Sequence, residues 1–233
     1  MKRIIVFWLV LLVPVIVFAK EYESSIINMK ISVNANYIVL MQDNLENNPD
    51  LEKLNVTKEN MLKLMQGNNI YFDIVKSDLS YEILVVVPKT KVEYSDLSHA
   101  SDLELRNLKE AIIKETGDKV PIIYKNDYTF MVVSYYDDNG YYNVNYHTVI
   151  NHQGYNIQLQ KKGEITIDEQ NELREIIDSI YFKDFDVKKD NSVKSTTTIK
   201  KSFDHKIIVY SIIIGVIAGL ITYYILAKHS KKK

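Results

Sequence analysis

The feature that most constrains this chain is an uncharged apolar run from Ile207 to Ala227. At a helical rise of 1.5 Å per residue its 21 residues reach about 31 Å, which matches the hydrocarbon thickness of a bilayer. Lys206 precedes the run and four lysines lie in residues 228–233. By the positive-inside rule, the sequence predicts one transmembrane helix over 207–227 and a basic cytoplasmic tail over 228–233.

The first 19 residues have the order of a secretory signal peptide. Lys2 and Arg3 precede an uncharged run from Ile4 to Phe18, and Val17-Phe18-Ala19 suits a cleavage site. An uncleaved anchor is the alternative, although a run interrupted by Pro14 is short for a bilayer core. The sequence therefore predicts a single-pass protein of the cell membrane, with its domain outside and its C-terminus cytoplasmic.

Three small residues, Ser211, Gly215 and Gly219, share one face of the predicted transmembrane helix. Glycines four residues apart let two helices approach closely, which is the GxxxG pattern of helix pairing. The same pattern is frequent by chance in apolar helices. A homodimer through this helix and a simple lipid-facing helix therefore both remain open.

Charge is segregated along the chain, although the net charge is only -1. The N-terminal segment carries +2, the C-terminal tail +4 and residues 183–206 +3, so residues 20–182 carry -10. Residues 183–206 have no apolar periodicity, which predicts a flexible stalk. The net charge of -1 suggests no nucleic-acid partner. With no cysteine, the domain must be held together by core burial alone.

Residues 20–182 alternate between strand and helix signals, which predicts an α+β domain: an antiparallel sheet meander covered by helices. Thr57 is a candidate N-cap for a helix over 58–66 that stops at Gly67. Capping boxes at Ser101–Glu104 and Thr166–Glu169 open two more helices. Strands are expected over 26–33, 37–41, 70–75, 81–87, 120–124, 128–137, 141–150 and 155–161.

Two turns predict how the last strands pair. A two-residue turn at Asn139-Gly140 would pair Tyr135 with Val144, and the Asn151–Gly154 turn would pair Thr148 with Ile157. One buried apolar face is then expected to hold Met131, Val133, Tyr135, Val144, Tyr146, Thr148, Ile157 and Leu159. The opposite face would collect Ser134, Tyr136, Asn143, Asn145, His147, Asn156, Gln158 and Gln160.

This second set is the candidate binding face. Amide side chains and tyrosines on a sheet can bind a glycan or a peptide through hydrogen bonds and stacking. A solvated sheet face is the simpler interpretation of the same pattern.

The end of the domain resembles PsbP-like proteins. The resemblance rests on Tyr155–Gln160, Ile165–Glu169 and Leu173–Phe182, where a meander is closed by a helix ending in a Ser-aromatic signature. The stretches 68–75 and 80–85 are also similar to exported proteins of low-GC Gram-positive bacteria. The resemblance implies an α/β/α sandwich that acts as a non-enzymatic scaffold or binding factor. The Gly-Trp expected after the first strand is absent, and no ligand residue can be transferred.

No catalytic, metal or cofactor motif is found. His99, His147 and His152 have no paired-ligand spacing, and Asp137-Asp138-Asn139-Gly140 lacks the ligands of a calcium loop. We therefore expect no catalytic residue, no metal and no cofactor.

The favoured function is a non-catalytic, membrane-anchored extracytoplasmic binding or accessory module. The membrane bilayer and an envelope protein or glycan are its expected partners. Two alternatives stay open: an envelope hydrolase that uses Asp137 and Asp138 near the sheet edge, and a ligand-sensing subunit that relays through its transmembrane helix.

Overall fold

The computed structural model of the 233-residue chain describes residues 19–46, 48–92, 95–116, 119–183 and 185. The predicted signal peptide, almost all of the predicted stalk, the predicted transmembrane helix with Ser211, Gly215 and Gly219, and the basic tail lie outside the described residues. Within the ranges that are described, no helix is both long and apolar enough to cross a membrane.

The centre of the fold is a seven-stranded antiparallel sheet with the order β3-β4-β5-β9-β8-β7-β6. A smaller sheet, in the order β1-β2-β10, pairs the start of the domain with its end. The strands are β1 (Lys20–Ser24), β2 (Met29–Val33), β3 (Tyr37–Met41), β4 (Ile70–Lys76), β5 (Tyr81–Val86), β6 (Ile122–Lys125), β7 (Thr129–Tyr136), β8 (Tyr141–Ile150), β9 (Gln153–Lys162) and β10 (Tyr181–Phe182).

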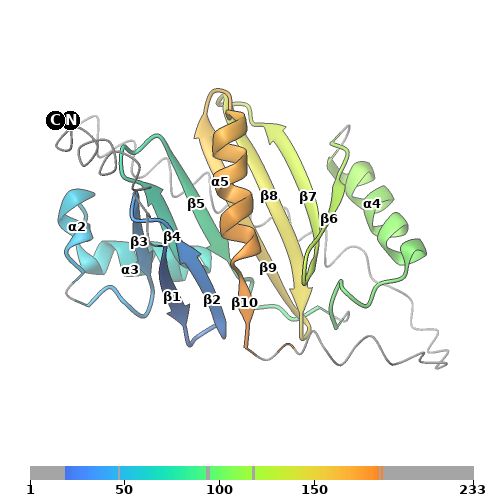
Figure 1. Cartoon of the computed structure of the whole chain (residues 1–233), viewed down its shortest axis with the longest axis horizontal. Helices are drawn as coiled ribbons and strands as arrows, with labels where there is room; N and C mark the ends of the chain where they lie inside the picture. Colours follow the sequence, from blue (N-terminus) through green and yellow to red (C-terminus); the bar gives the residue numbers. More distant parts are fainter. Residues whose placement is uncertain (1–18, 47, 93–94, 117–118, 184, 186–233) are drawn as a thin grey trace, which may run out of the picture.

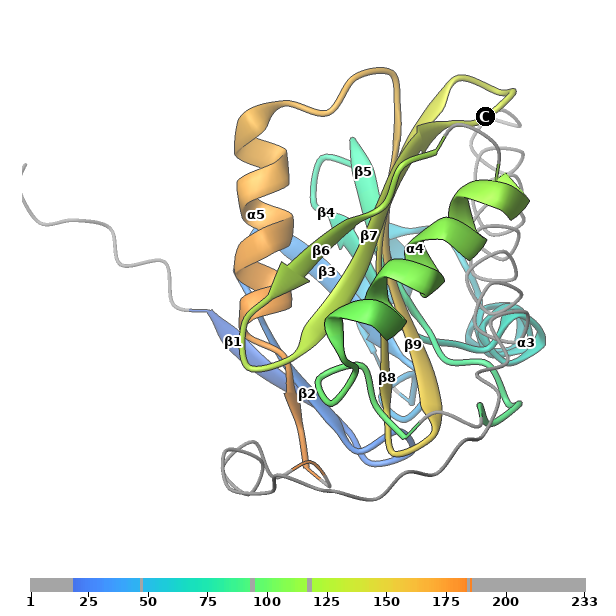
Figure 2. The ribbon, with the colours of Figure 1, turned by 90° about the vertical axis from the view of Figure 1, so that its right-hand side faces the viewer.

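Helices cover the large sheet from both sides. Figures 1 and 2 show α5 (Ile167–Asp178) and the small sheet on one side, which we call the front face. On the other side, the back face, α3 (Lys58–Asn68) and α4 (Asp102–Thr116) lie at opposite ends of the sheet. A short helix, α2 (Asp50–Lys53), precedes α3. The predicted α+β class is confirmed, and β6 to β9 form the predicted meander.

The predicted helix starts are confirmed by their hydrogen bonds. The Thr57 hydroxyl accepts from the backbone of Asn60, and Thr166 and Glu169 form a reciprocal capping box. Ser101 and Glu104 form the same pair of bonds at the start of α4. The predicted stop at Gly67 is wrong by two residues: α3 ends at Asn68, and the residue that stops it is the C-cap Asn69, which adopts the left-handed conformation (φ 55°).

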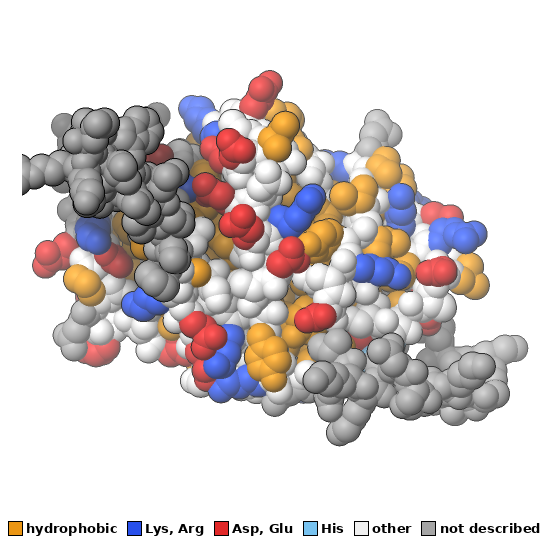
Figure 3. Space-filling model, in the orientation of Figure 1, with side chains coloured by type: hydrophobic (Ala, Val, Ile, Leu, Met, Phe, Trp, Pro, Cys, Tyr) orange, Lys and Arg blue, Asp and Glu red, His pale blue; other side chains and the backbone are white. Residues whose placement is uncertain are grey.

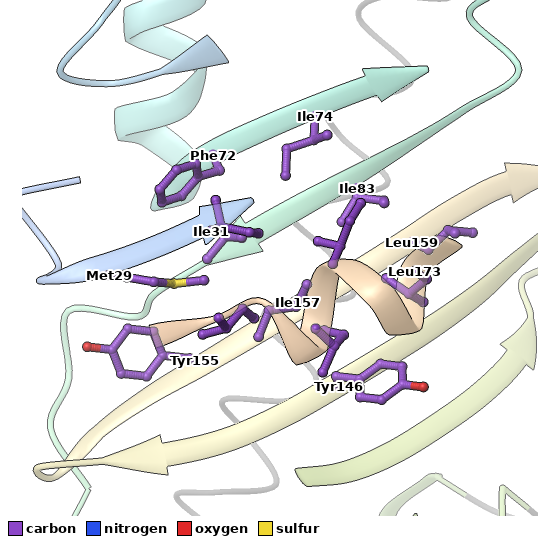
Figure 4. Close-up of a cluster of buried hydrophobic side chains, with 14 of the residues drawn as sticks. Met29, Ile31, Phe72, Ile74, Ile83, Tyr146, Tyr155, Ile157, Leu159 and Leu173 are labelled. Carbon is purple, nitrogen blue, oxygen red and sulfur yellow. The ribbon is translucent and has the colours of Figure 1, made fainter. Parts of the chain in front are cut away.

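The front face holds the main hydrophobic core. Apolar side chains of the large sheet meet α5 and the small sheet there, as Figure 4 shows for Phe72, Ile157 and Leu173. In the view of Figure 3 charged side chains of both signs are interspersed over this side of the molecule. The front layer therefore consists of an apolar interior under a surface that carries charges of both signs.

Two smaller apolar clusters lie on the back face, one under each helix. Met61 and Met65 of α3 pack with side chains of β3, β4 and β5, including Leu84. Leu108 of α4 packs with side chains of β7, including Val133. The strands between these clusters, β8 and β9, contribute only Val149 to them.

The pairing of β7 with β8 differs from the prediction by one residue. Ser134 is opposite Val144, and Tyr135 is opposite Asn143. The turn has three residues rather than two: Asp137 and Tyr141 face each other across it, and Gly140 has a positive φ of 78°. The Asp137 carboxylate accepts hydrogen bonds from the backbone of Asn139 and Tyr141, which stabilises this longer turn.

A one-residue shift of register moves every side chain of a strand to the other face. Ser134 and Tyr136 therefore lie on the front face, opposite to the prediction, while Met131, Val133 and Tyr135 lie on the back face. The second hairpin pairs Thr148 with Tyr155 instead of Ile157. This register differs from the prediction by two residues. Because side chains alternate with a period of two, the side chains of β8 and β9 still lie on the predicted faces.

Candidate functional site: a buried polar face between two helices

Six polar side chains form a compact block on the back face of β8 and β9. Cross-strand pairing places them in three adjacent rows. The rows are Asn143 with Gln160, Asn145 with Gln158, and His147 with Asn156. We call these six residues the polar block. Because they occupy alternate positions of two paired strands, all six point to the same side of the sheet.

The polar block is buried, which was not predicted. None of its six side chains is more than 1% exposed. By contrast, Tyr136 of the predicted face is 53% exposed on the front side, where its ring packs edge-on against Tyr142. Ser134 is exposed as well. The interpretation as a solvated sheet face is therefore wrong for the block and holds only for these two residues.

Hydrogen bonds within the block satisfy only part of its polar atoms. The Gln158 amide donates to Asn143 at 3.0 Å, and Asn143 donates to the backbone carbonyl of Tyr141 at 3.2 Å. The Asn156 amide donates to Asn145 at a long 3.5 Å. These bonds orient the amides relative to one another, but most of the hydrogen-bond donors and acceptors of the amides take no part in them.

Many atoms of the block have no hydrogen-bond partner among the described residues. They are both ring nitrogens of His147, Asn156 Oδ1, Gln158 Oε1, and Gln160 Oε1 and Nε2, whereas the Asn145 side chain meets the Tyr135 hydroxyl. Burying one such atom unpaired costs about 1–3 kcal/mol, and native proteins pair nearly all of them. These atoms are therefore left to groups other than the described side chains, such as water or a ligand.

Two buried carboxyls extend the block on its β5 side, and sequence reasoning missed both. Glu82 of β5 is opposite Gln160, and Asp73 of β4 is opposite Leu84 on the same face. Both are at most 4% exposed. Burial raises the pKa of Asp73, and burial together with the nearby charge of Asp73 raises the pKa of Glu82.

A signal for these carboxyls was present in the sequence. Asp73 interrupts the apolar strand Ile70–Val75, and Glu82 interrupts Tyr81–Val87. An acidic residue inside an otherwise apolar strand is rare in a core unless it is paired. What the sequence did not show is that the two strands bring these residues together beside β9.

His147 lies at the far end of the block from the carboxyls. Burial lowers the pKa of its imidazole to about 4, so the ring is neutral at pH 7. A neutral imidazole has one donor and one acceptor nitrogen. In chemical terms the block therefore offers both donors and acceptors, with two buried carboxyls at one end.

The other predicted residues have structural partners. Asp137 holds the β7–β8 turn, as described above, and Asp138 lies in that turn. His99 is bonded to Asp96 at the approach to α4, and His152 contacts the backbone carbonyl of Val92. Across the described residues, no three His, Cys, Asp or Glu side chains gather in an arrangement that could hold a metal ion.

Comparisons with known proteins assign no family. No family model matches the chain, and no curated protein matches it. A crystal structure from Bacteroides thetaiotaomicron is similar with a TM-score of 0.41 and 10% identity, over 70% of this chain and 48% of that one. The chain thus spans about half the length of that protein.

The solution structure of cyanobacterial PsbP (CyanoP) from Synechocystis is similar with a TM-score of 0.31 and 10% identity. The similarity covers 73% of this chain and 95% of that one. A PsbP protein is thus among the structural neighbours, in line with the resemblance in the sequence. At these TM-scores the likeness carries no argument about function, which depends on the site alone.

Proposed function

We propose that this protein is a non-catalytic binding module, exported and anchored by the predicted helix over 207–227, that holds a small polar ligand on the polar block. The observation that carries the proposal is the set of buried, unpartnered atoms on His147, Asn156, Gln158 and Gln160. A ligand rich in hydroxyl groups suits them, because hydroxyls and amides each donate and accept hydrogen bonds.

The setting of the block supports binding in preference to catalysis. Apolar clusters under α3 and α4 flank it on both sides, a combination typical of ligand sites, where a few polar groups are placed in apolar walls. The acidic residues of the hydrolase alternative, Asp137 and Asp138, are in a turn and not in the block. No observation on the described residues favours the relay alternative.

Native mass spectrometry of the full chain, released from its own membrane in mild detergent, tests this proposal. We expect a co-purifying small molecule on the wild-type protein. Gln158→Leu should reduce its occupancy at least tenfold, because Leu has a similar volume but no polar atoms. Ser134→Ala is the matched control, since Ser134 lies on the other face of the same sheet.

A wild-type spectrum without a bound molecule would argue against the proposal. So would a molecule whose occupancy is the same in Gln158→Leu and in the wild type. The first result would indicate that the polar block is an internal face whose atoms bind water. The second would indicate that the ligand binds elsewhere on the protein.

A further inference from the structure

The two carboxyls beside the polar block form an acidic corner without a counter-charge. Asp73 and Glu82 are diagonal neighbours on paired strands, because Asp73 is opposite Leu84 and Glu82 is opposite Val75. Such diagonal positions are about 7–8 Å apart along the sheet, so one small group can contact both side chains. Gln160 is directly opposite Glu82 on the next strand, which adds a third polar side chain to this corner.

The acidic corner has more acceptors than donors, because the Gln160 amide nitrogen is its one unpaired donor among the described residues. Both oxygens of Asp73, Oε1 of Glu82 and Oε1 of Gln160 have no hydrogen-bond partner there. None of the ion pairs formed by described residues includes Asp73 or Glu82. Lys76, the lysine nearest along β4, is bonded to Glu172 on the front face.

Two desolvated carboxyls side by side are costly unless a cation or a shared proton neutralises them. A buried hydrophobic pair at these positions would stabilise the fold better. Two buried carboxyls next to an unsatisfied block of amides therefore cost the fold stability, as expected of groups that serve a ligand.

We propose that the ligand carries an ammonium group that is held by Asp73, Glu82 and Gln160, while its hydroxyl groups bond to the remaining amides. This inference rests on the proposed function and narrows its ligand class to a hydroxylated amine, such as an amino sugar. An ammonium group has three N–H donors, which match one acceptor from each of the three side chains.

A metal ion fits the corner less well than an ammonium group. Ca²⁺ takes six to eight oxygen ligands and Mg²⁺ prefers an octahedral set, whereas this corner offers two carboxyls and one amide oxygen. The amides of Asn143 and Asn145, further along the block, suit hydroxyl groups, which a bare ion lacks. The extent of the block therefore favours an organic cation.

Thermal unfolding of the full chain in detergent micelles at pH 7 tests the proposal with two matched probes. D-glucosamine and D-glucose differ in an ammonium group in place of one hydroxyl. We expect glucosamine to raise the Tm in a saturable manner, and glucose to bind at least tenfold more weakly.

The variants Asp73→Asn and Glu82→Gln keep the shape of each side chain and remove its charge. Each should weaken glucosamine binding at least tenfold. Glu110→Gln is the matched control, because Glu110 is an exposed carboxyl on α4, and it should bind like the wild type.

The same variants separate binding from folding. Without a ligand, Asp73→Asn should have a higher Tm than the wild type at pH 7, because it removes a buried carboxyl whose desolvation costs stability at neutral pH. A protein that is more stable yet no longer binds cannot have lost its ligand by unfolding. If either carboxyl were needed for the fold, its variant would instead have a lower Tm.

Several results would overturn the proposal. Equal binding of glucose and glucosamine would show that the site does not select an ammonium group, and a neutral co-purified molecule in the native mass spectrum would show the same. Either result would contradict this inference but not the proposed function. A Tm increase with calcium chloride alone, lost in Asp73→Asn, would assign the corner to a metal ion. Failure of both sugars to bind would exclude a ligand of this class.

Discussion

The two faces of the large sheet are built from the same strands, but they differ in whether their polar groups have hydrogen-bond partners. On the front face, α5 covers a continuous apolar core, and the carboxylate of Glu172 beside it is paired with two tyrosines and a lysine. On the back face, two apolar clusters are separated by a buried strip whose polar atoms are largely unpaired. The front face therefore stabilises the fold, whereas the buried polar strip of the back face lowers its stability.

A carboxylate on each face shows the difference. Glu172 of α5 accepts hydrogen bonds from Tyr37, Tyr81 and Lys76, the last at 2.5 Å. Burial alone would raise its pKa, but these partners outweigh burial and lower it. Asp73 on the back face has no such partners, and its pKa is raised by burial. The same functional group is thus stabilising on one face and destabilising on the other.

The largest expected effect comes from the front face. Phe72 is next to Asp73 in β4 but points into the core and is fully buried. Phe72→Ala should lower the free energy of unfolding by about 3–5 kcal/mol, because it removes buried apolar surface and leaves a cavity. Urea unfolding of the full chain in micelles measures this. A cost below about 1 kcal/mol would contradict the assignment of the core to this face.

The second effect is a pH dependence that comes from the back face. The unfolded pKa of His147 is about 6.5 and its folded pKa is about 4. Its contribution to stability is therefore complete above pH 6.5 and falls as the pH drops toward 4, by roughly 3 kcal/mol in total. Unfolding measured from pH 7.5 to 4 should show this loss in the wild type.

His147→Gln is the control for this profile, because glutamine does not titrate. The difference in stability between wild type and variant should change in favour of the variant as the pH falls. A difference that does not vary with pH would show that His147 is accessible to water and protons in the folded protein. The raised pKa values of Asp73 and Glu82 act in the opposite direction, since their cost appears as the pH rises.

The smallest effect tests the paired carboxylate of the front face. Glu172→Gln should cost about 1 kcal/mol at pH 7, a value reduced by the partial exposure of the group. Because the pKa of Glu172 is lowered, its contribution is present above pH 4.5 and disappears as the pH falls through the folded pKa. Wild type and variant should therefore converge at low pH.

Glu175→Gln supplies the comparison for this variant, since Glu175 is an exposed residue one position from the buried Ile176 in the same helix. It should change the free energy of unfolding little at any pH. Equal costs for the two variants would show that the Tyr37–Tyr81–Lys76 arrangement adds nothing to the stability of the front face.

Local patterns predicted the elements well because they depend on neighbours in the sequence. The caps at Thr57, Ser101 and Thr166 satisfy backbone groups within one helical turn, so a short stretch is enough to identify them. The faces of β8 and β9 were also correct, since a shift of two residues preserves alternation. The β7 register failed because an Asp137 side-chain contact added one residue to the turn.

The candidate site was predicted only in part. The six residues of the polar block were chosen from their alternation, but Ser134 and Tyr136 were assigned to the wrong face. Asp73 and Glu82 were not considered, because they are about 60 to 90 positions away from the block in the sequence. Only the pairing of β5 with β9 makes them its neighbours.

By itself, the sequence determined the α+β class, the helix starts, the meander and the common face of the β8 and β9 amides. The export signal, the membrane anchor and the pairing of its helix remain predictions from the sequence. Tertiary structure alone decided that the amide face is buried and that two carboxyls lie beside it. The physical reason is that periodicity shows which side chains share a face, whereas burial depends on what packs against that face from elsewhere in the chain.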